Sequence, residues 1–147
     1  MRFDIHSVCA VQNVFGPAAL TADNTPAPID LQGFHAAEIV LGVGIGGITF
    51  TGENKIEFVL THCDTSDGEY TPVTLDDVLG VPAVASGIIK ALTTAHGAAA
   101  TYRVGYRGGK RFLKLLADFS GTHGTATPLH ATVVKMHPEV SPVADAA

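Results

Sequence analysis

The most constraining feature of this sequence is a series of short apolar runs, rich in β-branched and aromatic residues, that recur about every 10 to 15 residues. The clearest run, Lys55–His62, alternates, with Ile56, Phe58 and Leu60 on one face of the predicted strand. Glycine, proline, asparagine and aspartate separate the runs, and helical periodicity is weak throughout. The pattern therefore predicts an all-β fold, an antiparallel β-sandwich of about eight strands.

The predicted strands are Ile29–Leu31, His35–Val43, Lys55–His62, Tyr70–Val73, Gly87–Leu92, Thr101–Tyr106, Arg111–Phe119 and Ala126–Met136. Asp67-Gly68 supplies the turn of one hairpin, and Arg107-Gly108-Gly109-Lys110 predicts a second, tight hairpin between its two flanking strands. Gly42–Gly47 is expected to form a turn or bulge. Asp76–Gly80, with its acidic start, is expected to form a short helical turn.

The length of 147 residues suits one domain with a single core. The predicted organisation is an N-terminal arm and loop at residues 1–28, a β-sandwich domain at 29–137 and a flexible tail at 138–147. The arm is expected to contain a short helix around Asp4–Asn13. The loop Gly16–Pro28, which contains Pro17 and Pro26, and the tail are the segments best able to reach neighbouring molecules.

Charged residues make up only 16% of the chain, although about 25% is typical of soluble domains, while hydrophobic residues reach 46%. A free monomer normally carries more surface charge, so we expect a homo-oligomer, with a dimer and a trimer both left open. The formal net charge of -5 disfavours nucleic acid as a partner, because a nucleic-acid binder needs a surplus of lysine and arginine.

The N-terminal residues do not predict a secretory signal, because Asp4 and His6 interrupt the apolar stretch. No run approaches about 18 consecutive apolar residues, so a membrane partner is not expected. Cys9 and Cys63 fit no metal-binding or disulfide pattern, and we expect both to stay unpaired in a reducing cytoplasm.

Candidate catalytic and metal-binding residues lack the spacing that such sites need. The best histidine candidates are His62, His123 and His130, but the chain has no HxH or HxxxH pair of the kind that a cupin-type metal site uses. The acidic loop that follows His62 lacks the alternation of an EF-hand, and its Asp-Gly pair is explained as turn chemistry; its candidate calcium ligands are Asp64, Asp67 and Glu69.

The Gly42–Gly47 cluster leads into a β-like segment, whereas a phosphate-binding loop must lead into a helix. The chain also has no GxSxG nucleophile motif. We therefore expect no metal, no cofactor and no enzymatic activity.

Basic residues are concentrated in one part of the chain. Five of the 9 lysines and arginines fall within twelve positions: Arg103, Arg107, Lys110, Arg111 and Lys114. In an acidic protein, such a patch can meet carboxylates of a partner, because arginine makes planar bidentate contacts. The alternative is a solvated hairpin. The predicted interface residues are Arg103, Arg107, Lys110, Arg111, Pro17 and Pro26.

Three segments in this order resemble a known family. They are IDLQGFHAAEIVLGVGIGGITFTGENKIEFVLTHCD, GEYTPVTLDDVLGV and YRVGYRGGKRFLKLLADFSGTHGTATPLHATVVKMHPEVSPV, and together they cover roughly residues 29–143. The chain is similar here to the cement, or decoration, proteins of tailed-phage capsids, of the type found in a short-tailed phage of Bordetella.

The resemblance implies a jelly-roll-like sandwich that binds the outer face of a shell built from the major capsid protein and bridges neighbouring capsomers as a symmetric oligomer. It implies a structural protein on the exterior of the virion, assembled in the host cytoplasm, and it carries over no active site and no contact residue. The alternatives are a carbohydrate-binding or tail or spike module and, third, a cupin-like metalloenzyme. Sugar platforms usually stack on tryptophan or tyrosine, and the chain has 0 Trp and 3 Tyr.

Overall fold

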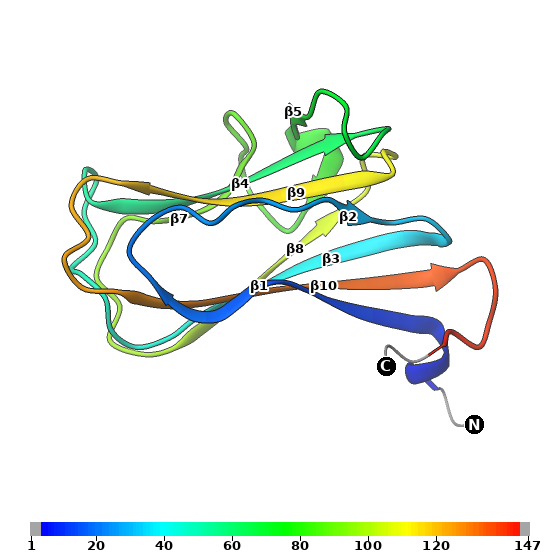
Figure 1. Ribbon diagram of the computed structural model, residues 1–147, viewed down its shortest axis with the longest axis horizontal. Helices are drawn as coiled ribbons and strands as arrows, with labels where there is room; N and C mark the ends of the chain where they lie inside the picture. Colours follow the sequence, from blue (N-terminus) through cyan, green and yellow to red (C-terminus); the bar gives the residue numbers. More distant parts are fainter. Residues whose placement is uncertain (1–3, 145–147) are drawn as a thin grey trace.

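The computed structural model describes residues 4–144, in which ten strands form two facing antiparallel sheets (Figure 1). Sheet A has the order β1 (Cys9–Leu20), β10 (Thr127–Pro138), β3 (Phe34–Val43), β8 (Ala100–Tyr106), β6 (Val78–Leu79). Sheet B has the order β2 (Ile29–Asp30), β9 (Phe112–Ser120), β4 (Lys55–Cys63), β5 (Thr71–Pro72), and β7 (Ile88–Leu92) also pairs with β4. Two 3₁₀ turns complete it, η1 (His6–Val8) and η2 (Leu75–Asp77). The predicted all-β sandwich is confirmed, with β1 and β6 as additional strands.

The core lies between the two sheets and follows from the alternation in the sequence. Ile56, Phe58 and Leu60 of β4 are all buried, as their spacing predicts. The inward residues of β3, β9 and β10 alternate with exposed or half-buried ones in the same way. Each of these four strands thus has one face in the core and one face turned outward. None of the helices in the described part of the chain is long and apolar enough to cross a membrane.

The N-terminal segment is a long strand, so the predicted helix and much of the predicted loop are wrong. Helical structure is limited to η1, and β1 then runs antiparallel to β10 through Pro17 to Leu20. Its Gly16-Pro17 pair resembles a loop signal. However, the strand register shifts between Phe15 and Ala18, and proline is tolerated at such a bulge on an edge strand because no ladder N–H is needed there.

Residues 21–28 lie along the edge of β9 and are held there by side chains (Figure 1). The Asn24 amide donates to the Leu115 carbonyl, 3.1 Å away, and its oxygen accepts from the Ala117 amide at 2.7 Å. Asp23 continues the series by accepting from the Phe119 amide at 2.7 Å. This segment, which we call the β9 strap, contains Pro26 and covers a sheet edge, instead of forming the free loop that the sequence predicts.

The β8–β9 connection crosses from one sheet to the other, so the predicted hairpin at residues 107–110 is also wrong. β8 pairs with β3 and β6, whereas β9 pairs with β2 and β4. The connection's amides bond elsewhere: Arg107 N–H donates to the Asp77 carbonyl and Lys110 N–H to the Tyr106 hydroxyl. Gly108 is required because a Cβ there would lie 2.7 Å from the Tyr106 ring.

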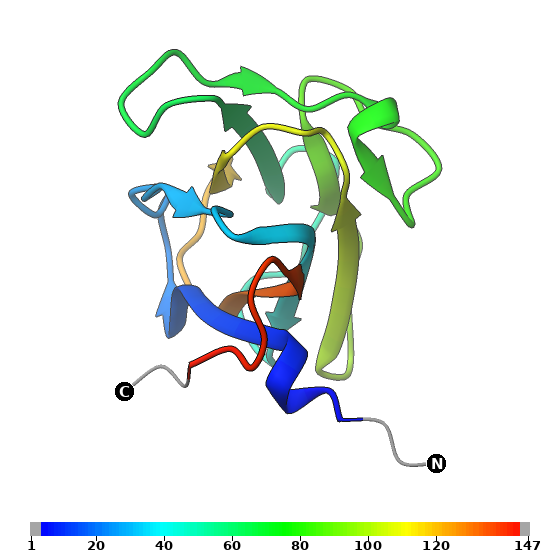
Figure 2. The same cartoon turned by 90° about the vertical axis from the view of Figure 1, so that its right-hand side faces the viewer.

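The described part of the predicted tail is hydrogen-bonded to the body. The Glu139 amide donates to Gly33, and both the Val143 amide and the Ser141 hydroxyl donate to the Ser7 carbonyl. The tail therefore passes beside the start of β1 (Figure 2). The first three residues of the predicted arm and the last three of the predicted tail lie outside the described residues.

Candidate functional site

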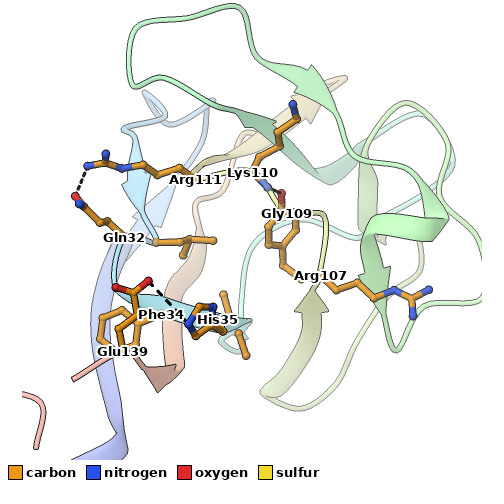
Figure 3. A pocket seen from close by; sticks show the side chains of 13 residues that line it. Gln32, Phe34, His35, Arg107, Gly109, Lys110, Arg111 and Glu139 are labelled. Atoms are coloured by element: carbon orange, nitrogen blue, oxygen red, sulfur yellow. Dashed lines mark hydrogen bonds and ion pairs between the residues drawn. The ribbon is translucent and has the colours of Figure 1, made fainter. Parts of the chain in front are cut away.

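A hollow of about 400 Å³ lies at the end of the sandwich where the β2–β3 turn, the β8–β9 connection and Glu139 meet (Figure 3). Its lining includes Leu31 and Phe34 and three of the five residues of the predicted basic cluster. The structure thus brings Arg107, Lys110 and Arg111 to one end of the molecule. Their side chains leave the hollow in three different directions (Figure 3).

Arg111 is engaged within the chain. Its Nε and a terminal nitrogen each donate to a different carboxylate oxygen of Asp30, both at 2.9 Å, and the second nitrogen also reaches Gln32 at 2.5 Å. Hydrogen bonding to this guanidinium lowers the pKa of Asp30. The pair joins β2 to the start of β9. The bidentate contact that the sequence predicts between arginine and a partner's carboxylate is therefore made by Arg111 with Asp30 of the same chain.

Lys110 is also paired within the chain. Its ammonium lies 2.6 Å from the Asp64 carboxylate, and this hydrogen bond raises the pKa of Lys110. Asp64, considered above as a calcium ligand, follows β4 in the sequence. The pair is exposed, so its contribution to stability is small.

Arg107 differs from these two residues, because none of the ion pairs among residues 4–144 includes it. Its Nε donates to the Asp76 carbonyl at 2.9 Å. The nearby Asp77 carboxylate has a lowered pKa, chiefly because it accepts from Thr74, with a smaller contribution from the positive charge of Arg107. The exposed guanidinium of Arg107 points away from the hollow (Figure 3).

The remaining predicted interface residues lie elsewhere. Arg103 is on the outward face of sheet A, 80% exposed and 3.2 Å from Glu38. Pro17 lines a separate hollow of about 340 Å³ beside His130. Pro26 belongs to the β9 strap. The six residues therefore do not form one surface.

A buried pair behind the β8–β9 connection was not found from the sequence. The Tyr106 hydroxyl lies 2.9 Å from Nδ1 of His62, joining β8 of sheet A to β4 of sheet B. Burial raises the pKa of Tyr106 to about 12. Since the hydroxyl oxygen accepts from Lys110 N–H, its own hydrogen can be donated to His62. The pair thus supports the connection that carries Arg107.

The three histidines considered as metal ligands are engaged with other groups. His62 contacts Tyr106, Nε2 of His123 lies 2.9 Å from the Ser120 carbonyl, and Nε2 of His130 lies 3.0 Å from Asn13. Across residues 4–144, no three histidine, cysteine, aspartate or glutamate residues are grouped so that they could hold a metal ion.

The outward faces of the two sheets differ sharply in charge, which the sequence analysis missed. On sheet B, the outward residues of β4 and β9 include four charged side chains: Lys55, Glu57, Lys114 and Asp118. On sheet A, Glu38 and Arg103 are the only lysine, arginine, aspartate or glutamate residues among the described outward residues, and they pair with each other. These outward rows cross β1, β10, β3, β8 and β6. The signal was present in the alternation, but the sequence did not tell which strands share a sheet.

The outward face of sheet A is instead largely apolar or neutral. Val11, in β1, and Leu79, in β6, are large apolar side chains that are 57% and 52% exposed. Between them lie Val134 of β10 and Glu38 of β3, in one row across the sheet. We call this surface the sheet A face. Apolar surface of this kind is typical of protein interfaces.

No protein-family model matches this chain, and no curated protein is significantly similar to it. A solved structure described as "Bacillus endospore appendages form a novel family of disulfide-linked pili" aligns with 92% of this chain and 96% of its own chain, with 13% sequence identity and a TM-score of 0.36. A similarity at this level does not bear on the function of this chain.

Proposed function

We propose that this chain is a structural protein of a tailed-phage head, a cement protein that binds the outer face of the shell formed by the major capsid protein. In this role it acts as a homo-oligomer that bridges neighbouring capsomers on the exterior of the virion, after assembly in the host cytoplasm. The proposal combines the resemblance of residues 29–143 to this family with the all-β sandwich fold.

The observation that carries the proposal is the sheet A face. A five-stranded surface with one ion pair and exposed Val11 and Leu79 is poorly suited to permanent contact with water and well suited to contact with protein. The charged outward face of sheet B is suited to solvent. This asymmetry fits a molecule that lies on a shell with one side and faces the medium with the other.

A cement protein does not need a deep binding site. When one oligomer contacts several capsomers, each contact adds to the others through a high effective concentration, so weak individual interfaces still hold the protein firmly. The shallow, largely neutral sheet A face is compatible with this mode of attachment.

The tyrosines favour this role over carbohydrate binding. The ring of Tyr102 has the Lys90 ammonium 4.1 Å from its centroid, and that of Tyr70 has Lys114 at 4.2 Å. Tyr106 is buried between the sheets. Tyr106 is therefore unavailable, and Tyr102 also packs against the core. Tyr70 alone is a small platform for a sugar ring.

The test is co-sedimentation with shells assembled from the major capsid protein encoded in the same genome and prepared without this chain. We expect saturable binding at a fixed copy number per capsid protein. No sedimentation above that of the protein alone would overturn the proposal.

A matched pair of variants tests the sheet A face. Val40 and Val59 are both half-buried, outward-facing valines in central strands, Val40 in sheet A and Val59 in sheet B. Val40→Glu should weaken shell binding about tenfold or more, because it adds a carboxylate, opposite Arg103, to a surface that the shell would cover, whereas Val59→Glu should leave binding within about twofold. Circular dichroism checks that both variants are folded. Equal binding by both would contradict the assignment of this face.

A further inference from the structure

The exposed edges of the two sheets are protected to very different degrees. An open strand edge can pair with another chain, and natural proteins normally block it with charge, short length, bulges or a covering segment. The β9 edge is covered by the β9 strap, and the edge strands β5 and β6 have two residues each. β6 pairs with only Gly105 and Tyr106 of β8, and the rest of that edge contains the charged Arg103. Lys90 lies at the edge strand β7, over the Tyr102 ring.

β1 is the long edge strand without a charge. It is a twelve-residue edge strand, and its sequence, CAVQNVFGPAAL, contains no charged residue. Its second half is interrupted by register shifts and by Pro17, which has no N–H to donate. Its first half is regular: Cys9–Asn13 pairs without interruption with residues 132–136 of β10. This stretch has neither charge nor bulge on its open edge.

We propose that Cys9–Asn13 pairs antiparallel with the same stretch of a second copy of this chain, around a two-fold axis that passes beside Val11. Directly opposite residues in an antiparallel pair project to the same face of the sheet. If one residue lies opposite the same residue of the second copy, outward residues of one copy lie opposite outward residues of the other. When that residue is Val11, all of Cys9–Asn13 pairs with Cys9–Asn13 of the second copy.

The absence of charge favours a second copy as the occupant. When a strand pairs with itself around a two-fold axis, a charge at or next to the axis lies close to its own duplicate, which is destabilising. The uncharged β1 strand avoids this repulsion entirely. Val11, which is 57% exposed, would then be covered by its counterpart.

The pairing has a consequence for the whole surface. A two-fold axis perpendicular to the sheet keeps the sheet A faces of both copies on the same side. The two five-stranded sheets then join into one continuous sheet with a neutral face of twice the area. This inference rests on the homo-oligomeric part of the proposed function and identifies its interface.

The first test uses Val11→Lys and, as a matched control, Leu79→Lys. Both residues are exposed and lie in the same outward row, at opposite edges of sheet A. Analytical ultracentrifugation without capsid protein should give a dimer for the native chain and for Leu79→Lys. Val11→Lys should weaken the dimer about tenfold or more, because two ammonium groups then face each other. A monomeric native chain, or equal behaviour of the two variants, would overturn the inference.

The second test does not depend on a destabilising change. In a chain carrying Cys9→Ser and Cys63→Ser, we introduce Val11→Cys or, as a control, Leu79→Cys. Mild oxidation should cross-link the Val11→Cys chain into a covalent dimer, because Cβ atoms of directly opposite residues lie about 4.5–5.5 Å apart. Cross-linking of the control to the same extent, or none for Val11→Cys, would overturn the inference.

The outcomes also separate the two proposals. If the chain is a dimer joined at β1 but does not bind shells, the cement function is contradicted and the β1 interface is supported. If the chain is a monomer that binds shells, the β1 interface is contradicted and shell binding is supported.

Discussion

Tyr106 is the residue on which the β8–β9 connection most depends. Its hydroxyl accepts from Lys110 N–H and contacts His62, and its ring packs against Gly108. These contacts replace the ladder hydrogen bonds that a hairpin would have made. Arg107 is positioned as a result, because its amide and its side chain bond to Asp77 and Asp76.

The raised pKa of Tyr106 predicts a loss of stability at alkaline pH. The phenol titrates at about 10 when unfolded, whereas burial raises its pKa to about 12 in the folded chain. Stability that is present below pH 10 is therefore lost as the pH rises towards 12, by about 2 kcal/mol. Urea unfolding between pH 9 and 12 should show this loss in the native chain and a smaller one in Tyr106→Phe. The same dependence of the free energy of unfolding on pH in the two proteins would refute the raised pKa of Tyr106.

Gly47 predicts a strong and local effect. Its φ is +85°, and a Cβ would overlap the Thr127 side chain, which is fully buried. Gly47→Ala should therefore lower the free energy of unfolding by about 2–3 kcal/mol. Gly52→Ala is the control, because nothing lies within 4 Å of its Cβ position. Chemical denaturation that gave both variants the same stability would count against this packing.

Arg107 is the residue of the basic cluster best placed to meet an outside carboxylate, because Arg103, Lys110 and Arg111 each have one in the chain. If the cluster contributes to shell binding, Arg107→Glu should weaken co-sedimentation several-fold at low salt and less at high salt. Lys90→Glu makes the same charge change at β7 and should have little effect. Unaltered binding by a folded Arg107→Glu protein would show that the cluster is solvated and does not contact the shell.

At the scale of elements, the alternating strands could be predicted from the sequence, because one buried face imposes a period of two. β4 and β9 illustrate this. β1 could not be predicted from the sequence, since Gly16-Pro17 is tolerated in a strand only because this strand lies at an edge. The passage of the β8–β9 connection from one sheet to the other could not be predicted either, because distant residues determine which strand each one pairs with. The pairing of Arg111 with Asp30, 81 positions away, is hidden for the same reason.

The β9 strap predicts that one asparagine matters more than its loop position suggests. Asn24→Ala removes both hydrogen bonds to the β9 backbone and should destabilise the fold by about 1–3 kcal/mol, because the backbone groups of the buried residues Leu115 and Ala117 lose their partners. Thr25→Ala, at the exposed next residue, should change stability by less than about 0.5 kcal/mol. Thermal unfolding of the two variants checks this. Equal melting temperatures would show that the strap is not a stabilising element.

For the whole molecule, the main feature is the separation of charge between the two sheets. Sheet B carries the charged outward residues, whereas sheet A offers a neutral face and the uncharged edge strand β1. The shortage of charged residues in the sequence is therefore most marked on one surface, the sheet A face, instead of being spread evenly. The sheet A face supports the proposal of attachment to a shell, and the uncharged edge of β1 supports the proposal of pairing with a second copy.

The most direct test of the cement function is electron cryomicroscopy of phage heads produced with and without the gene for this chain. We predict additional density on the outer surface of the shell at repeated positions between neighbouring capsomers, fitted by the sandwich with its sheet A face towards the shell. Identical shells in the two preparations, or density for the sandwich only at the tail, would contradict the account.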